Sequence, residues 1–227
     1  MSLNDYWLLS LPFFGAMVGI MFAHFFPLKK TLGLKIILSF SGAFLLGITV
    51  FELFPVIFSK GSKQLSVYVM GGILFQIVLE YFSKGAEHGH YHTGGSNFFP
   101  LTLWLSLSIH AFVEGMPLSN QMELTYGIVI HKIPTGVILS LIIGKTNISS
   151  KIKWSALILF SLMTPIGSLT MTYTPSLIEN QLEIIAWVMG MILHISTIIL
   201  FESNENHLFN LNKLVTILLA ILLAYLI

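Results

Sequence analysis

The chain has 227 residues, of which 55% are hydrophobic and only 9% charged, with a formal net charge of +1 and a mean hydropathy of +0.86. Soluble domains carry about 25% charged residues and disordered chains need low hydrophobicity with high charge, so this composition excludes both classes. The small net charge offers no basic patch for nucleic acid, and the absence of cysteine excludes disulfides, a thiolate nucleophile and a cysteine-based zinc site.

Eight apolar stretches predict an all-α membrane protein with eight transmembrane helices. A membrane helix needs about 20 mostly apolar residues, and these stretches are separated by glycine, proline, asparagine and lysine, which mark turns and loops. No linker is long enough to divide the chain, so we predict one transmembrane domain over residues 1–227. The predicted spans are residues 6–26, 33–58, 65–83, 98–119, 122–144, 154–173, 182–201 and 208–227.

The lysines predict the orientation of these spans. Eight of them fall on one side of the membrane and two on the other, while Lys132 lies inside a span. Because lysine-rich loops face the cytoplasm, we expect both termini outside, the loop 84–97 in the cytoplasm, and a multi-pass protein of the cell's inner membrane. The lysines assigned to the cytoplasmic side are Lys29, Lys30, Lys35, Lys84, Lys145, Lys151, Lys153 and Lys213, against Lys60 and Lys63 outside.

The densest group of ionisable side chains inside the membrane lies in the fourth and fifth spans. His110 and Glu114 are four residues apart and share one helix face, as do His131 and Thr135. The short turn between the spans makes them an antiparallel hairpin. At about 1.5 Å per residue, both histidines then lie about 15 Å below the surface, near the middle of the hydrocarbon core.

Two imidazoles and a carboxylate at one depth suit zinc and similar divalent ions. His110, Glu114 and His131 are therefore the predicted primary metal ligands, and buried ionisable groups in spans are functional candidates by default. The alternative is that each histidine makes only structural hydrogen bonds to neighbouring helices.

The motifs in these two spans resemble those of the ZIP (Zrt/Irt-like) family of divalent-metal transporters. The family's fourth span carries His-Asn-x-x-Glu-Gly, where this chain has His-Ala-Phe-Val-Glu-Gly at 110–115. Its fifth span carries His-Lys-x-x-Glu-Gly, where this chain has His-Lys-Ile-Pro-Thr-Gly at 131–136. Weaker similarities at 41–55 and 164–167 extend the resemblance along the chain. It implies a divergent bacterial-type member, a 3+2+3 arrangement of spans with an inverted repeat, and import of metal into the cytoplasm.

Two positions depart from the family pattern. Ala111 replaces the asparagine and Thr135 replaces the second glutamate, which in two-metal members help to hold the second ion. Lys132 places a cation where that ion would lie, and like charges repel strongly in a low dielectric. We therefore predict one transport metal, with Thr135 giving a weak hydroxyl contact or only a structural one. The alternative is a variant that has lost transport.

Further candidate ligands lie outside this group. Glu52 occupies a position where the family commonly has histidine, His194 lies in the seventh span, and Glu202 ends that span. For the two glutamates, snorkelling to water is the alternative interpretation. The loop candidates, expected to bind metal only weakly and transiently or to be merely solvated, are His88, His90 and His92.

These observations predict a transporter rather than an enzyme, with zinc as the expected cargo and iron, manganese and cadmium as alternatives. No cofactor is expected, and the partners are the metal ion, the lipid bilayer and a second copy of the chain, since small residues such as Gly15 and Gly19 allow close helix contact within or between protomers. Two rival hypotheses remain: an intramembrane zinc-dependent hydrolase, which lacks an HExxH motif here, and a metal sensor that does not transport.

Overall fold

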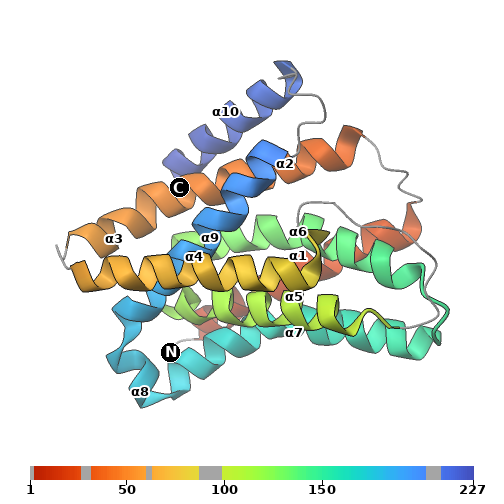
Figure 1. Cartoon of the computed structure of the whole chain (residues 1–227), viewed down its shortest axis with the longest axis horizontal. Coiled ribbons are helices and arrows are strands. Elements are labelled where there is room, and N and C mark those ends of the chain that lie inside the picture. The colour runs from red at the N-terminus through yellow and green to blue at the C-terminus, as the bar shows by residue number, and fades with distance from the viewer. Residues whose placement is uncertain (1–2, 27–31, 60–62, 87–98, 203–210) are drawn as a thin grey trace.

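The computed structural model describes residues 3–26, 32–59, 63–86, 99–202 and 211–227, and the regular secondary structure of these ranges is helical (Figure 1). Seven helical stretches are long and apolar enough to cross a membrane, which is the pattern of a multi-pass membrane protein. The longer helices are α1 (Leu3–Phe25), α2 (Leu32–Ile48), α4 (Lys63–Ser83), α5 (Leu101–Gly115), α6 (Met122–Gly144), α7 (Ser150–Tyr173), α9 (Gln181–Glu202) and α10 (Leu211–Leu226).

Seven predicted spans coincide with these stretches, and the eighth differs. α10 has only 16 residues, about 24 Å of helix at 1.5 Å per residue, so it is shorter than a typical span. Eight crossings therefore remain a prediction. There are two smaller differences. α7 begins four residues before the predicted start, because Ser149 caps it by accepting a hydrogen bond from the Ile152 amide. A short helix, α8 (Pro175–Glu179), follows α7.

Two of the spans are irregular helices. The second continues from α2 through a π-helical segment, η1 (Thr49–Leu53), into α3 (Phe54–Phe58). The fourth continues from α5 into a 3-10 helix, η3 (Met116–Asn120), with a proline in its first turn. Proline lacks the amide hydrogen that an α-helix needs, so α-helical hydrogen bonding stops there. Both irregular segments pack against α9.

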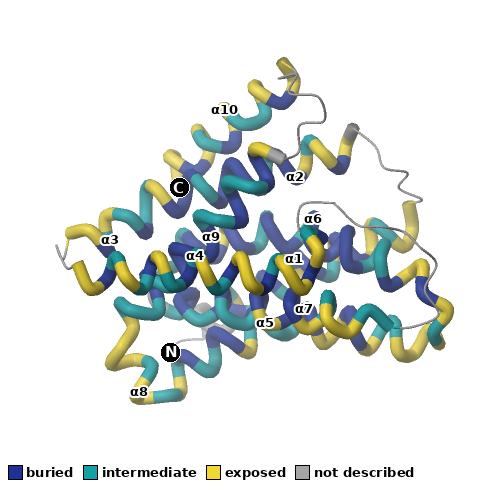
Figure 2. Tube along the Cα trace, viewed as in Figure 1, coloured by how far each residue is buried: buried dark blue, intermediate teal, exposed yellow. Residues whose placement is uncertain are grey.

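Burial differs strongly between the helices (Figure 2). In the span Gly33–Phe58, in α6 and in α9, 61% of the membrane-length window is buried inside the protein, whereas in α4 only 28% is. The exposed side chains of α4 and α10 are mainly large and apolar. A broad apolar surface of this kind is unusual for a monomeric soluble protein and suits contact with lipid.

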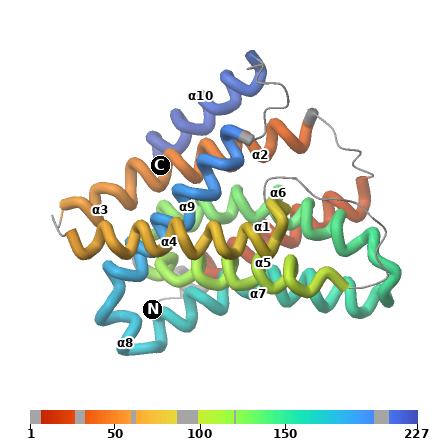
Figure 3. The backbone as a smooth tube through the Cα atoms, viewed as in Figure 1, coloured from red at the N-terminus to blue at the C-terminus, as the bar shows by residue number. Residues whose placement is uncertain are grey.

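The helices pack as two groups of four. Bundle A consists of α1, α5, α6 and α7, and bundle B consists of α2, α4, α9 and α10. In the backbone trace α2, α9 and α10 lie above α5 and α7 (Figure 3). The two bundles meet chiefly where α2 packs on α6 and where α4 packs on α5.

Inside each bundle, glycines bring helix backbones into contact. A Cβ atom at Gly19 of α1 would clash with the Ile133 carbonyl oxygen of α6, and one at Gly72 of α4 would clash with the Trp187 carbonyl oxygen of α9. Gly15 also lies against the α6 backbone. Small residues permit such close helix packing in membranes. The sequence did not decide whether Gly15 and Gly19 make contacts within one chain or between protomers. In the structure they make contacts within the chain.

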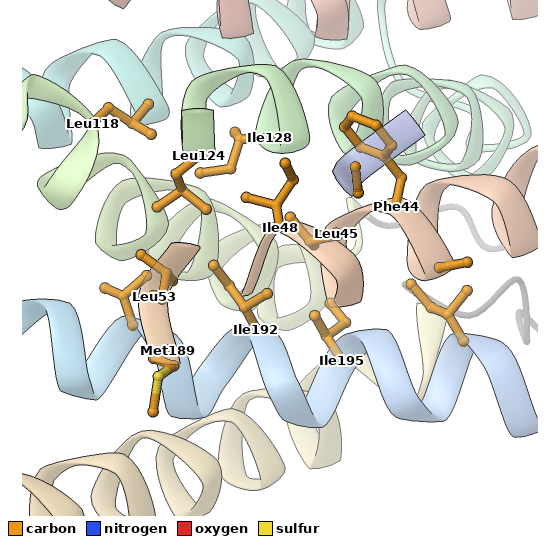
Figure 4. Packing of buried hydrophobic residues seen from close by; sticks show 14 of the residues in the cluster. Phe44, Leu45, Ile48, Leu53, Leu118, Leu124, Ile128, Met189, Ile192 and Ile195 are labelled. Atoms are coloured by element: carbon orange, nitrogen blue, oxygen red, sulfur yellow. The ribbon is translucent and has the colours of Figure 1, made fainter. Parts of the chain in front are cut away.

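The contact between the bundles is built from side chains instead. α2 lies between α6 and α9, with aliphatic and aromatic side chains filling the space (Figure 4). At Gly127 of α6, the nearest atoms of α2 belong to the side chains of Leu45 and Ile48 rather than to its backbone. The labelled side chains of this region are Phe44, Leu45, Ile48, Leu53, Leu118, Leu124, Ile128, Met189, Ile192 and Ile195.

Candidate metal centre

Three side chains from the hairpin of α5 and α6 converge inside bundle A. His110, Glu114 and His131 each offer one ligand atom, and these atoms lie within 4.8 Å of one another. All three residues are at most 1% exposed. Within the described part of the chain, this is the group of His and Glu side chains that meets the geometry of a metal site.

Local helix geometry and the hairpin together produce the convergence. His110 and Glu114 are one turn apart on α5 and their side chains touch, with 3.1 Å between Nε2 and Oε2. The segment η3 turns the chain so that α6 returns beside α5, which places the His131 ring centroid 6.2 Å from that of His110. The two rings therefore lie side by side, and their depth in the membrane stays a prediction.

The two oxygens of Glu114 have different partners. Oε1 forms an ion pair with Lys132 and accepts a hydrogen bond from the Thr164 hydroxyl of α7 at 3.4 Å. Oε2 faces His110. One oxygen is thus occupied by an internal cation, and the other points toward the imidazole that would share a metal ion.

Lys132 is the counter-charge of this site. It lies 1% exposed on α6, next to His131, and its ammonium is 5.1 Å from the centre of the Phe160 ring, within reach of a cation–π interaction. A buried charge is tolerated when it is paired. That Lys132 takes the position of a second metal ion stays a prediction.

Polar side chains from neighbouring helices hold both imidazole rings. The Gln76 amide oxygen of α4 lies 2.8 Å from His110 Nδ1, and the Ser41 hydroxyl of α2 lies 3.2 Å from His131 Nδ1. Thr135 lies 3.3 Å from His131 Nε2 and donates to the His131 carbonyl oxygen at 2.8 Å. Metal-binding histidines characteristically have such a partner on the second ring nitrogen.

This arrangement suits a divalent ion held by few ligands. Three protein ligands leave a coordination position open. With neutral imidazoles, Glu114 and Lys132 cancel, so a bound dication leaves an uncompensated charge of +2 in a medium of low dielectric. The centre is therefore chemically suited to a metal that binds and leaves.

The other predicted ligands do not join this group. His194 of α9 contacts Glu80 of α4 at 2.7 Å, and both line a surface pocket with Lys84. Glu52 lies in η1, partly exposed. The remaining candidates fall outside the described residues or side chains: Glu202, His88, His90 and His92.

Sequence reasoning missed three supporting residues: Gln76, Ser41 and Thr164. Gln76 carried a usable signal, because an amide in an apolar run of a membrane helix needs a partner. Ser41 and Thr164 carried a weaker one, since serine and threonine in such helices commonly bond to their own backbone. Thr164 instead donates to the Ala111 carbonyl oxygen of α5 at 3.0 Å as well as reaching Glu114.

Comparison with known proteins adds no functional information to this geometry. No protein-family model and no curated protein matches the chain. The buried convergence of two imidazoles, one carboxylate and one ammonium in a helical membrane protein is thus the basis for a functional assignment.

Proposed function

We propose that the chain is a carrier of divalent metal ions of the ZIP type, importing zinc into the cytoplasm through His110, Glu114 and His131. The observation that carries this proposal is the meeting of these three side chains, fully buried, on a membrane-length helix hairpin. The resemblance of both span motifs supports the family and the direction of transport. Within the described residues there is one such cluster, and this together with the position of Lys132 supports one metal ion per chain.

The charge balance favours a carrier over a static metal site. A transported ion must bind well enough to enter and weakly enough to leave. Structural zinc sites are closed by four ligands, whereas this centre offers three ligands and an adjacent ammonium that opposes a dication. An ion held in this way is expected to exchange.

The two bundles offer a means of alternating access. All three ligands belong to bundle A, while bundle B covers them through α2 and α4. Glycine contacts tie helices within each bundle, and side chains separate the bundles. We propose that the bundles move relative to one another as units, so that the centre opens to each side of the membrane in turn.

The pattern of helix pairs supports the 3+2+3 arrangement. An inverted repeat would relate the first three spans to the last three and α5 to α6. Under this relation the pair α1–α6 corresponds to the pair α7–α5, and the pair α4–α9 corresponds to the pair α10–α2. All four pairs pack closely in the structure. Thr49, at the start of η1, and Thr197 of α9 donate to the carbonyl oxygens of Leu45 and Leu193, each at 2.7 Å. Inverted repeats produce this kind of correspondence.

Zinc uptake into proteoliposomes tests the proposal. Purified protein is reconstituted with a zinc indicator trapped inside, and we expect saturable zinc entry. His131→Ala is expected to abolish entry, because it removes one of three ligands. His24→Ala is the matched control: this histidine is exposed at the end of α1, where it contacts Trp154, and its removal is expected to leave uptake unchanged.

Two results would contradict the carrier. Normal uptake by His131→Ala would show that the ion does not pass through this centre. No uptake by the wild type, combined with one tightly retained zinc per chain, would favour a hydrolase or a sensor instead.

A further inference from the structure

A glutamine from bundle B reaches into the metal centre of bundle A. Gln76 lies on α4, is fully buried, and places its amide oxygen 2.8 Å from Nδ1 of His110 on α5. Its amide oxygen faces Nδ1 of His110, whereas Glu114 faces Nε2 of the same ring. Its place at the boundary of the bundles gives it a role distinct from that of the ligands.

The chemistry of the amide oxygen determines which nitrogen of His110 can bind metal. A carbonyl oxygen only accepts hydrogen bonds, so Nδ1 of His110 must carry the hydrogen that it donates. Oε2 of Glu114, 3.1 Å from Nε2, also only accepts, so Nε2 faces it with a hydrogen until a metal ion takes that place; the lone pair of the neutral ring then lies on Nε2, while Nδ1 still donates to Gln76. Gln76 therefore directs the metal-binding nitrogen toward the carboxylate.

His131 is held in a less restrictive way. Its Nδ1 faces the Ser41 hydroxyl at 3.2 Å, and a hydroxyl both donates and accepts. Ser41 is thus compatible with either neutral tautomer of His131, whereas the Gln76 oxygen selects one tautomer of His110. Of the two imidazoles, His110 is the one whose protonated nitrogen is fixed from the other bundle.

We propose that Gln76 is a positioning residue that makes His110 a strong metal ligand only while α4 and α5 keep the arrangement described here. This inference rests on the proposed transport function. When the bundles move apart, the bond between Gln76 and His110 breaks, the ring loses its fixed tautomer, and the affinity for the ion falls. Metal release is thereby coupled to the motion that opens the centre.

Substitutions of Gln76 separate this role from simple packing. Gln76→Met keeps the approximate volume and removes the acceptor, and Gln76→Glu keeps an acceptor at the same reach. Loss of a partner that orients a metal-binding histidine typically lowers affinity about 10–100-fold. We expect Gln76→Met to raise the KM for zinc uptake about 10-fold or more with little loss of maximal rate, and Gln76→Glu, which keeps the acceptor and adds a negative charge, to leave the KM at or below that of the wild type.

Gln64→Met provides the matched control, because Gln64 lies exposed in the first turn of the same helix. We expect it to leave the KM unchanged. If Gln76→Met fails to fold, Gln76→Asn replaces it, since the amide is retained but is one methylene too short to reach His110. An unchanged KM in a folded Gln76→Met or Gln76→Asn variant would overturn the inference.

A measurement without metal keeps this test independent of transport. Nitrogen NMR of labelled histidine, with His110→Gln used to assign the signal, reports which ring nitrogen carries the hydrogen. We expect Nδ1 of His110 to carry a hydrogen-bonded proton in the wild type and in Gln76→Glu, and to lose that hydrogen bond in Gln76→Met. An unchanged Nδ1 signal in Gln76→Met would refute the positioning role, while a wild type that neither binds nor carries zinc would refute the proposed function.

Discussion

Two contacts between a glutamate and a histidine lie in different parts of the molecule. Glu114 and His110 are 3.1 Å apart on one face of α5, with side chains 0% and 2% exposed. Glu80 and His194 are closer, at 2.7 Å, but join α4 to α9 within bundle B, with side chains 21% and 13% exposed. The shorter contact is not the better metal site.

The surroundings of the two contacts explain the difference. Glu114 and His110 have a third ligand in His131, a counter-charge in Lys132 and an orienting partner in Gln76. The other pair forms no comparable group of three within the described residues and lines an open pocket. A metal centre requires convergence and support from several helices, which one ion pair between two helices does not supply.

The largest expected effect comes from removing the charge of the buried contact. Glu114→Gln leaves Lys132 buried without its counter-charge, which typically costs about 3–5 kcal/mol. We expect that loss in the free energy of unfolding in detergent, together with loss of zinc uptake in proteoliposomes.

A double variant separates these two losses. In Glu114→Gln combined with Lys132→Met both charges are gone, so most of the lost stability should return while uptake remains absent. Recovery of uptake along with stability would show that Glu114 serves the fold alone.

The next effect concerns the counter-charge. In Lys132→Met the Glu114 carboxylate loses its buried counter-charge, and the ammonium that repels a divalent cation is gone. We expect zinc to bind at least about 10-fold more tightly, which corresponds to about 1.4 kcal/mol, and the melting temperature to rise more on zinc addition than it does in the wild type. Zinc titration and thermal melting check this. Unchanged affinity would mean that the ammonium does not oppose the ion.

A smaller effect is expected from restoring the carboxylate that the family pattern has in the fifth span. Thr135→Glu adds a negative charge one turn from His131. We expect tighter binding, slower release and a lower maximal rate of uptake, measured by zinc titration and initial rates. Thr135→Ser, which keeps the hydroxyl, should behave like the wild type. Equal affinity in Thr135→Glu would place residue 135 away from the ion.

The smallest effect is expected at the second contact. His194→Ala removes an ion pair that is partly exposed, and such pairs contribute at most about 1 kcal/mol. We expect near-normal uptake and a small change in the free energy of unfolding. A loss of uptake as complete as that of His131→Ala would instead make this pair part of the ion's path.

Features that depend on local sequence were predictable. The long apolar helices follow from composition and length, and the shared face of His110 and Glu114 follows from helical periodicity. The meeting of these residues with His131 was predictable because a short turn fixes the relative depth of two helices. Each of these features needs only a few neighbouring residues and the geometry of one hairpin.

Features that depend on distant helices were not predictable. Gln76 and Ser41 lie 34 and 90 residues from the histidines that they contact, and no periodicity links them. His194 was a candidate ligand, but the packing of α9 on α4 directs it toward Glu80. The π-helical segment η1 was also missed, because the apolar pattern does not distinguish it from an α-helix.

The sequence by itself determined that this chain is helical and apolar enough for a membrane, and that two imidazoles and a carboxylate come together in one hairpin. Spacing of 3.6 residues per turn and the cost of exposing apolar surface suffice for both. Only the tertiary structure decided which helices form each bundle, that Lys132 pairs with Glu114, and that bundle B supplies the partners of both imidazoles. Those outcomes depend on close packing between helices far apart in the chain, where glycine positions and side-chain shape select one arrangement.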